Sequence, residues 1–156
     1  MAQTTSALPR GSYQVELSDD NSTWIDVSGS TTTVSGMEQA RKTGETYTAQ
    51  GDAAIITSGK REPLNPTHDT VYTETSGESF ETVRAYFEAG TPVYVRYSPL
   101  LGASGAKRYF SSNGEGTAVA AVISNFSYFE FESDSGDSIA SSYDLMFPAL
   151  TSETVA

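Results

Sequence analysis

The sequence predicts a mainly β domain: a β-sandwich or partly closed barrel with one flanking helix and a long loop between two strands. Alternating apolar and polar residues, as in residues 13–17, are typical of half-buried strands. Only residues 79–89 combine helical apolar spacing with a terminating glycine. Gly-rich and Ser-rich connectors separate the strand segments, as they do in antiparallel β domains.

The strand segments follow one another along the chain. Residues 13–17 and 24–27 flank a turn at residues 19–21 and predict a hairpin. A Thr-rich stretch that ends at Val34 also favours β structure. Further strands are predicted at residues 53–58, 64–73, 92–97, 108–111, 118–126, 128–132 and 143–147.

The helix at residues 79–89 is predicted from a single apolar face, which consists of Phe80, Val83 and Phe87. Gly90 is expected to end it in a left-handed conformation. Two N-terminal caps are open: Thr75 with Glu78, which have the spacing of a capping box, or Ser79.

A long polar segment at residues 36–52 separates two predicted strands. Connections in compact domains are mostly about 4–6 residues long, and longer ones are usually functional or disordered. We therefore expect this loop to have a function beyond joining the strands.

The chain of 156 residues suits one domain. We expect a flexible segment at residues 1–12, a single β domain at residues 13–148 and a loose tail at residues 149–156. There is no cysteine, which excludes disulfides and thiolate metal sites.

The composition is strongly acidic, with 20 Asp and Glu against 9 Lys and Arg. Nonspecific binding of nucleic acid needs a basic surface, which this chain lacks overall, so we expect duplex DNA to be repelled. No secretory signal is predicted at the N-terminus. The longest apolar run, residues 118–123, is too short to span a bilayer, and no membrane partner is expected.

Nothing in the sequence predicts an enzyme. His68 is the only histidine, and the adjacent Asp69 would point to the opposite face of a strand, so the two cannot form a catalytic pair. We expect His68 to be a surface or interface residue. There is no GxSxG motif, and residues 102–107 lack the spacing of a phosphate-binding loop. No cofactor is predicted.

Acidic residues alternate near residue 130. Glu130, Glu132 and Asp134, with Asp137 nearby, could ligate calcium, but their spacing does not fit an EF-hand. A solvated acidic face and an electrostatic role for that face are the alternatives. We assign no metal site.

Basic residues come mostly in adjacent pairs within or beside connectors. Small basic patches on loops suit docking onto an acidic partner, including a second copy of the chain, although they also occur simply for solubility. The pairs are Arg41 with Lys42, Lys60 with Arg61, and Lys107 with Arg108.

Three stretches resemble the major tail protein, or tail tube protein, of long-tailed bacteriophages, of the non-contractile kind. They are VELSDDNSTWIDVSGS, SGMEQARKTGETYTAQGDAAIITSGKREP and VYTETSGESFETVRAYFEAGTPVYVRYSP. The resemblance covers residues 13–147. It lies in the order of features, namely a hairpin with a tryptophan, a long polar loop, GKREP, and one helix that ends in EAGTP.

The resemblance implies a β-sandwich with a flanking helix that assembles into rings, usually six-fold, stacked into a hollow tube. One sheet of each subunit would contribute to an inner barrel through which double-stranded DNA passes without specific binding. The partners would be further copies of the chain and other phage tail proteins. The protein would be located in the virion tail and synthesised in the host cytoplasm.

The resemblance also assigns roles to particular residues. Residues 36–52 would be an arm that reaches a neighbouring subunit and folds on assembly. Glu130 and Glu132 are the candidates for acidic residues that face the lumen. The candidates for the subunit and ring interfaces are Met37, Arg41, Lys42, Tyr47, Lys60 and Arg61.

A second hypothesis is a stand-alone β-sandwich that binds carbohydrate or protein. Trp24 and three tyrosines, Tyr94, Tyr97 and Tyr109, could form a stacking platform. Their alternating positions also suit a core. Self-association would separate the two hypotheses, because a binding module should remain monomeric.

Overall fold

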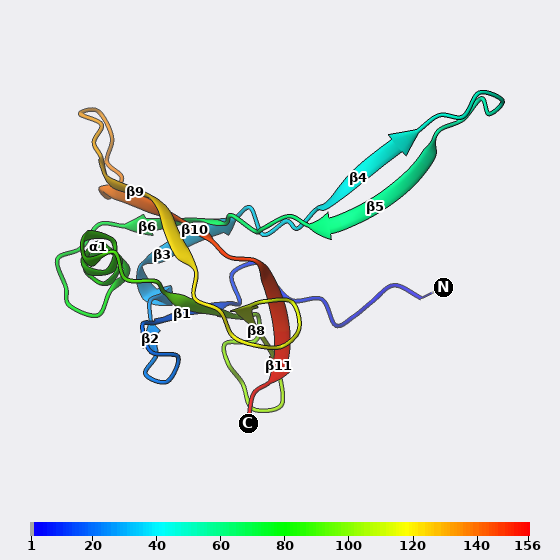
Figure 1. Cartoon of the computed structure of the whole chain (residues 1–156). Helices are drawn as coiled ribbons and strands as arrows, with labels where there is room; N and C mark the ends of the chain where they lie inside the picture. The colour runs from blue at the N-terminus through cyan, green and yellow to red at the C-terminus, as the bar shows by residue number, and fades with distance from the viewer. Residues whose placement is uncertain (1) are drawn as a thin grey trace.

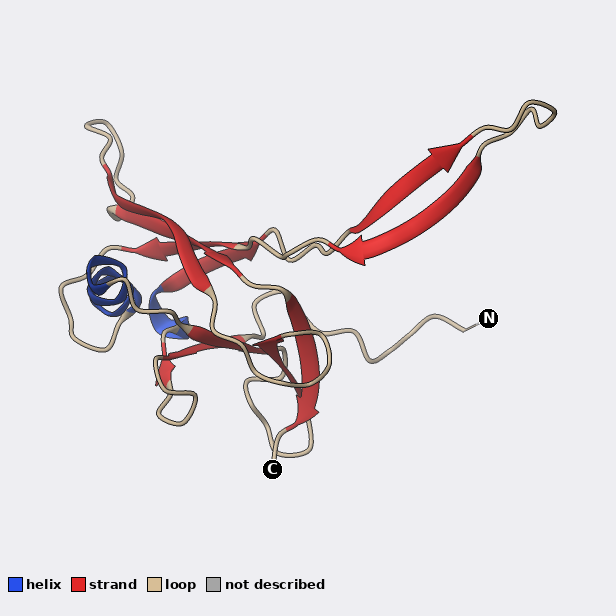
Figure 2. Ribbon diagram, viewed as in Figure 1, coloured by secondary structure: helices blue, strands red, loops and turns tan. Residues whose placement is uncertain are grey.

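The computed structural model describes residues 2–156 as two packed β-sheets with one α-helix at their side and a long two-stranded arm (Figure 1). Figure 2 shows that strands make up most of the regular structure of both the body and the arm. The predicted β-sandwich with one flanking helix is confirmed, and the sheets do not close into a barrel.

The first sheet has five antiparallel strands in the order β11-β8-β7-β1-β2. Strand β1 pairs with β2 on one side and with β7 on the other, which confirms the predicted N-terminal hairpin. The strands are β1 (Gln14–Ser18), β2 (Ile25–Asp26), β7 (Tyr94–Ser98), β8 (Lys107–Ser112) and β11 (Ala149–Thr154).

The second sheet has four antiparallel strands in the order β3-β6-β10-β9. A short 3₁₀ helix, η1 (Ser28–Ser30), leads from the first sheet into β3. The strands are β3 (Thr31–Ser35), β6 (Thr67–Val71), β9 (Val122–Glu130) and β10 (Ala140–Met146).

The core lies between the two sheets. Val15 and Leu17 of β1 alternate with more exposed residues, as do Tyr143 and Leu145 of β10. This period of two places one face of each sheet against the other. The predicted alternation at residues 13–17 therefore identified a true core strand.

The helix α1 (Ser79–Ala89) has the predicted bounds and ends at Gly90, whose φ of 70° is left-handed. Phe80 and Val83 are buried, whereas Phe87 is partly exposed. Neither predicted cap is correct. The Ser30 hydroxyl accepts a hydrogen bond from the Ser79 backbone N–H at 2.9 Å, so a residue distant in sequence caps the helix.

Two predictions about the strands were wrong. Residues 149–156, expected to be a loose tail, contain β11, which pairs with β8 along its whole length. The strands predicted at residues 118–126 and 128–132 are replaced by the single strand β9. The strand predicted at residues 53–58 is present as β5 (Ile55–Arg61), which belongs to the arm. No helix within residues 2–156 is long and apolar enough to cross a membrane.

Candidate functional site

The arm is a β-hairpin made of β4 (Arg41–Thr46) and β5 (Ile55–Arg61), and these two strands form a sheet of their own. It projects away from the sandwich (Figure 1). Residues 36–52 were predicted to be a polar loop that folds only on assembly. In the structure, residues 41–46 of that segment form β4, which pairs with β5. The arm therefore includes β5 and ends near residue 62.

The arm exposes most of its surface, including its apolar side chains. Tyr47 is 66% exposed and Ile56 is 65% exposed. An isolated two-stranded hairpin is at best marginally stable in water, because it buries little apolar area. Exposed β-branched and aromatic side chains on such a hairpin indicate a surface that a partner covers.

Four cations lie on the two strands at the root of the arm: Arg41, Lys42, Lys60 and Arg61. Arg41 lies opposite Arg61 in the strand register. Like charges in that position repel each other. Arg84, Arg96 and Arg108 pair with carboxylates elsewhere, but none of the four arm cations forms an ion pair within residues 2–156. This charge is free to meet an acidic partner.

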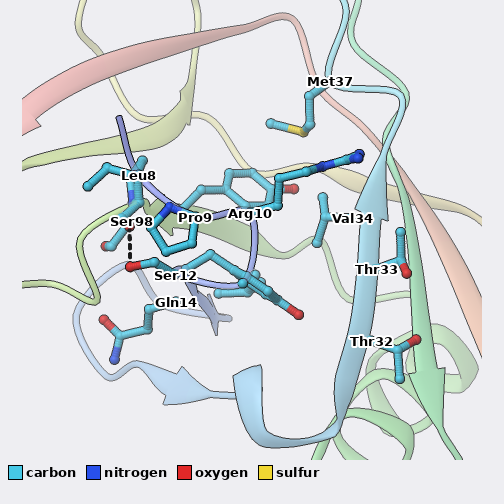
Figure 3. Close-up of a pocket in the computed structure, with 15 residues that line it drawn as sticks. Leu8, Pro9, Arg10, Ser12, Gln14, Thr32, Thr33, Val34, Met37 and Ser98 are labelled. Carbon is cyan, nitrogen blue, oxygen red and sulfur yellow. Dashed lines mark hydrogen bonds between the residues drawn. The ribbon is translucent and has the colours of Figure 1, made fainter. Parts of the chain in front are cut away.

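Met37 does not lie on the exposed part of the arm. It lines a cavity of about 580 Å³ together with Val34, Tyr97 and two residues of the N-terminal segment, Leu8 and Pro9 (Figure 3). The prediction that Met37 is an exposed apolar anchor of the arm is therefore not supported by its position. It belongs to the joint between arm and body.

The root of the arm is fixed to the body by one side chain. The Gln39 Nε2 donates hydrogen bonds to the backbone carbonyls of Glu62 at 3.0 Å and of Pro148 at 2.7 Å. The backbone N–H of Glu62 also donates to the Ala40 carbonyl at 2.8 Å. These bonds join the two sides of the arm to each other and to Pro148, which lies between β10 and β11.

Glu130 and Glu132 lie on a second projection, the connection between β9 and β10. Glu130 is the last residue of β9, and Glu132 follows in the exposed turn region with Asp134 and Asp137. Within residues 2–156, no three His, Cys, Asp or Glu side chains lie close enough together to hold a metal ion.

The outer face of the four-stranded sheet is small, polar and acidic. Along its two central strands, buried residues alternate with more exposed residues that form the outer face. The more exposed residues are Thr67, Asp69 and Val71 on β6 and Ala140, Ser142 and Asp144 on β10. Asn125 and Ser127 of β9 continue the same rows. Neither β3, β6, β9 nor β10 contains a lysine or arginine.

Several solved structures share this architecture at low sequence identity. A chain from the sheath/tube terminator of the extracellular contractile injection system PVC is 15% identical with a TM-score of 0.70, over 97% of this chain and 100% of that chain. A chain from the tail of the empty GTA particle, refined with C6 symmetry, is 8% identical with a TM-score of 0.67, over 96% and 100%. A chain of the SPP1 tail tube is 9% identical with a TM-score of 0.64, over 95% and 80%.

The chain has the tail-tube fold. The predicted resemblance is confirmed at the level of fold, and it extends to nearly the whole chain. No family model matches the sequence, and no curated protein matches it. Because injection systems with contractile sheaths are among the similar structures, this likeness does not separate contractile from non-contractile tails.

The tail-tube body has a buried polar centre that the sequence did not reveal. His68, expected at the surface, is fully buried. Its Nδ1 lies 2.8 Å from the Tyr143 hydroxyl and its Nε2 lies 2.7 Å from the Tyr97 hydroxyl. Tyr97 belongs to the five-stranded sheet, whereas His68 and Tyr143 belong to the four-stranded sheet, so the bond between His68 and Tyr97 connects the two layers.

Burial lowers the pKa of His68 to about 3, since the charged imidazolium would lose its hydration. Burial likewise raises the pKa values of Tyr97 and Tyr143. All three groups are therefore neutral at pH 7. The cluster therefore links the two sheets through hydrogen bonds between neutral groups.

The aromatic platform required by the binding-module hypothesis does not form. The guanidinium of Arg96 lies over the Trp24 ring, 4.0 Å from its centroid, and is held there by two hydrogen bonds to Glu16 of 2.8 and 3.0 Å. Tyr97 points its hydroxyl toward His68 in the core. Trp24 and Tyr97, two of the four residues proposed for stacking, are thus engaged in separate intramolecular contacts.

Proposed function

We propose that this protein is a structural subunit of a tail tube of the phage type, which assembles as stacked hexameric rings. Double-stranded DNA would pass through the tube without specific binding. The observation that carries the proposal is a tail-tube fold with a long, exposed arm whose two strands, within residues 2–156, pair only with each other. The protein would act without a cofactor or catalytic site, together with other tail proteins.

The place of action follows from the same proposal. The subunit would be synthesised in the host cytoplasm and would function in the tail of the virion. A tail tube without a contractile sheath remains our expectation from the sequence resemblance. An assembled particle that shows a sheath around the tube would contradict that expectation.

The arm fits the requirements of a ring or stack. A heterologous interface joins one patch to a different patch on the next subunit, and its repetition produces rings or filaments. Arg41, Lys42, Lys60, Arg61 and Tyr47 are all on the arm and are proposed as interface residues. Covering Tyr47 and Ile56 would remove apolar surface from water at each contact.

The open face of the four-stranded sheet is proposed as the lumen lining. In the part of the chain that the structure describes, no further strand pairs with β3 or β9 at the edges of this sheet, so neighbouring subunits could extend it into a closed barrel. Asp69 and Asp144 on this face would repel the DNA backbone, because no cation on the four strands offsets them. We therefore propose that Asp69 and Asp144, in place of Glu130 and Glu132, are the acidic residues that face the lumen.

The proposal is tested by electron microscopy of the purified chain over a concentration series. We expect hollow tubes or stacked rings, with the face of Asp69 and Asp144 toward the channel at higher resolution. A chain that stays monomeric at every concentration would favour the binding-module hypothesis instead.

A shortened variant tests the arm itself. Residues 41–61 are replaced by a two-residue turn, which is possible because Ala40 and Glu62 are already hydrogen-bonded neighbours. We expect a folded monomer, checked by circular dichroism, that forms no tubes. Lys107→Ala, a change on the five-stranded sheet, is the control and should assemble normally. Tubes from the shortened chain would contradict the role of the arm.

A further inference from the structure

The end of β9 and the connection that follows it present exposed aromatic rings. Phe131 is 71% exposed and Phe129 is 46% exposed, and their rings stack with centroids 5.3 Å apart. Phe129 also stacks on Phe80 of α1 at 5.8 Å. The stack therefore extends from the core to the surface, and packing on α1 holds the outer rings in place. We call residues 128–139 the aromatic tip.

The aromatic tip contains a groove bounded by negative charge. A depression of about 500 Å³ is lined by Phe131, Ile139, Glu130, Glu132 and Asp137. Residues 109–156 include seven acidic side chains and no lysine or arginine. The carboxylates of the groove form no ion pair within residues 2–156. A matching partner would combine apolar side chains with cations.

The arm has this combination along its length. Arg41 lies opposite Arg61 at its root, with Lys42 and Lys60 beside them. Ile56 lies farther out, opposite Glu45, and the exposed Tyr47 follows directly after β4. The arm thus has apolar groups toward its outer end and four cations at its root.

We propose that the aromatic tip of one subunit is the docking surface for the arm of a neighbouring subunit. Ile56 and Tyr47 pack against Phe129 and Phe131, while the cations of the arm face the carboxylates of the groove. This inference rests on the proposed tube function and identifies the partner surface of the arm.

The positions of the two projections favour a contact between copies. The arm and the aromatic tip leave the body on opposite sides, so one chain does not bring them together (Figure 1). The cavity beside Met37 is a poorer socket for the arm, because Arg10 lines it and would repel the cations of the arm (Figure 3). Contact between unlike patches generates a ring or a filament.

Cysteine cross-linking tests the contact directly, since the chain has no cysteine of its own. A variant with Ile56→Cys and Phe131→Cys is allowed to assemble and is then oxidised. We expect a ladder of disulfide-linked oligomers on a non-reducing gel. The control pairs Ile56→Cys with Leu101→Cys, at an equally accessible loop position, and should give no ladder. Tubes without a ladder from the first variant would overturn this inference and leave the tube function intact.

Charge exchange gives an independent test. Lys60→Glu with Arg61→Glu should raise the concentration needed for assembly by at least about tenfold, as should Glu130→Lys with Glu132→Lys. Combining all four changes in one chain should restore assembly, since the contact then has reversed but complementary charge. Lys107→Glu is the matched control and should have no effect. Failure of the combined variant to recover, while each pair alone blocks assembly, would contradict the pairing.

Discussion

The sandwich body and the arm are built from the same kind of strand but differ in what surrounds the strands. In the body, His68, Tyr143 and Leu145 are almost completely buried, and the His68 ring is hydrogen-bonded to Tyr143 within its own sheet and to Tyr97 of the other sheet. In the arm, β5 is exposed along its whole length, and the cations on both strands lack carboxylate partners. The body thus pairs most of its buried polar side chains internally, whereas the arm leaves its cations and apolar side chains exposed.

This difference separates residues that stabilise the single subunit from residues that act only in assembly. Apolar residues of the body stabilise the subunit, so their replacement should be detected in the unfolding of a single chain. Apolar residues of the arm lie in water in the free subunit, and their replacement should be detected only in assembly. The following predictions measure how complete that separation is.

The largest expected effect is on the core. Leu145→Ala should lower the free energy of unfolding by about 3 kcal/mol, because it removes a fully buried side chain and leaves a cavity. Ile56→Ala in the arm should change it by less than about 0.5 kcal/mol. Urea denaturation of the monomer at low concentration measures both. Equal losses in the two variants would show that the arm is part of the cooperative core.

The second effect is the pH dependence that His68 imposes on the body. Its pKa in the folded chain is about 3, below the ordinary value of 6.5, so the unfolded chain binds more protons between these two pH values. Stability is complete above pH 6.5 and falls as pH decreases toward 3, by roughly 2 kcal/mol at pH 5. Urea titrations at several pH values measure this slope.

His68→Phe provides the comparison for that slope. It should lower stability at pH 7 by about 2 kcal/mol, because the hydroxyls of Tyr97 and Tyr143 lose their partner. It should also reduce the loss of stability between pH 6.5 and pH 5. A variant with an unchanged slope would show that other groups cause the acid sensitivity.

The smallest effect concerns the cap of α1. Ser30→Ala removes the hydroxyl that accepts from the Ser79 backbone N–H, and it should cost about 1 kcal/mol. Thr75→Ala, at the position that the sequence indicated as a cap, should cost less. A greater loss from Thr75→Ala, measured by thermal unfolding, would contradict the cap seen in the structure.

Local sequence patterns predicted the parts of the fold that depend on neighbouring residues. The helix at residues 79–89 was found with its bounds, since its apolar spacing and Gly90 are local signals. The hairpin of β1 and β2 was found in the same way. Long-range contacts decided the rest. Ser30 caps a helix far away in sequence, and β11 is a strand because β8 offers an edge.

The features of the candidate site also divide into those that the sequence predicted and those that only the tertiary structure decided. The sequence by itself identified the basic pairs, the acidic run after β9, and a long segment in need of a function, because charge and composition are properties of the chain alone. Only the tertiary structure decided that Met37 lies beside a cavity, that His68 is buried, and that Asp69 and Asp144 share an open sheet face. These facts depend on which strands pair and in what register, and strand pairing joins residues that no local pattern connects.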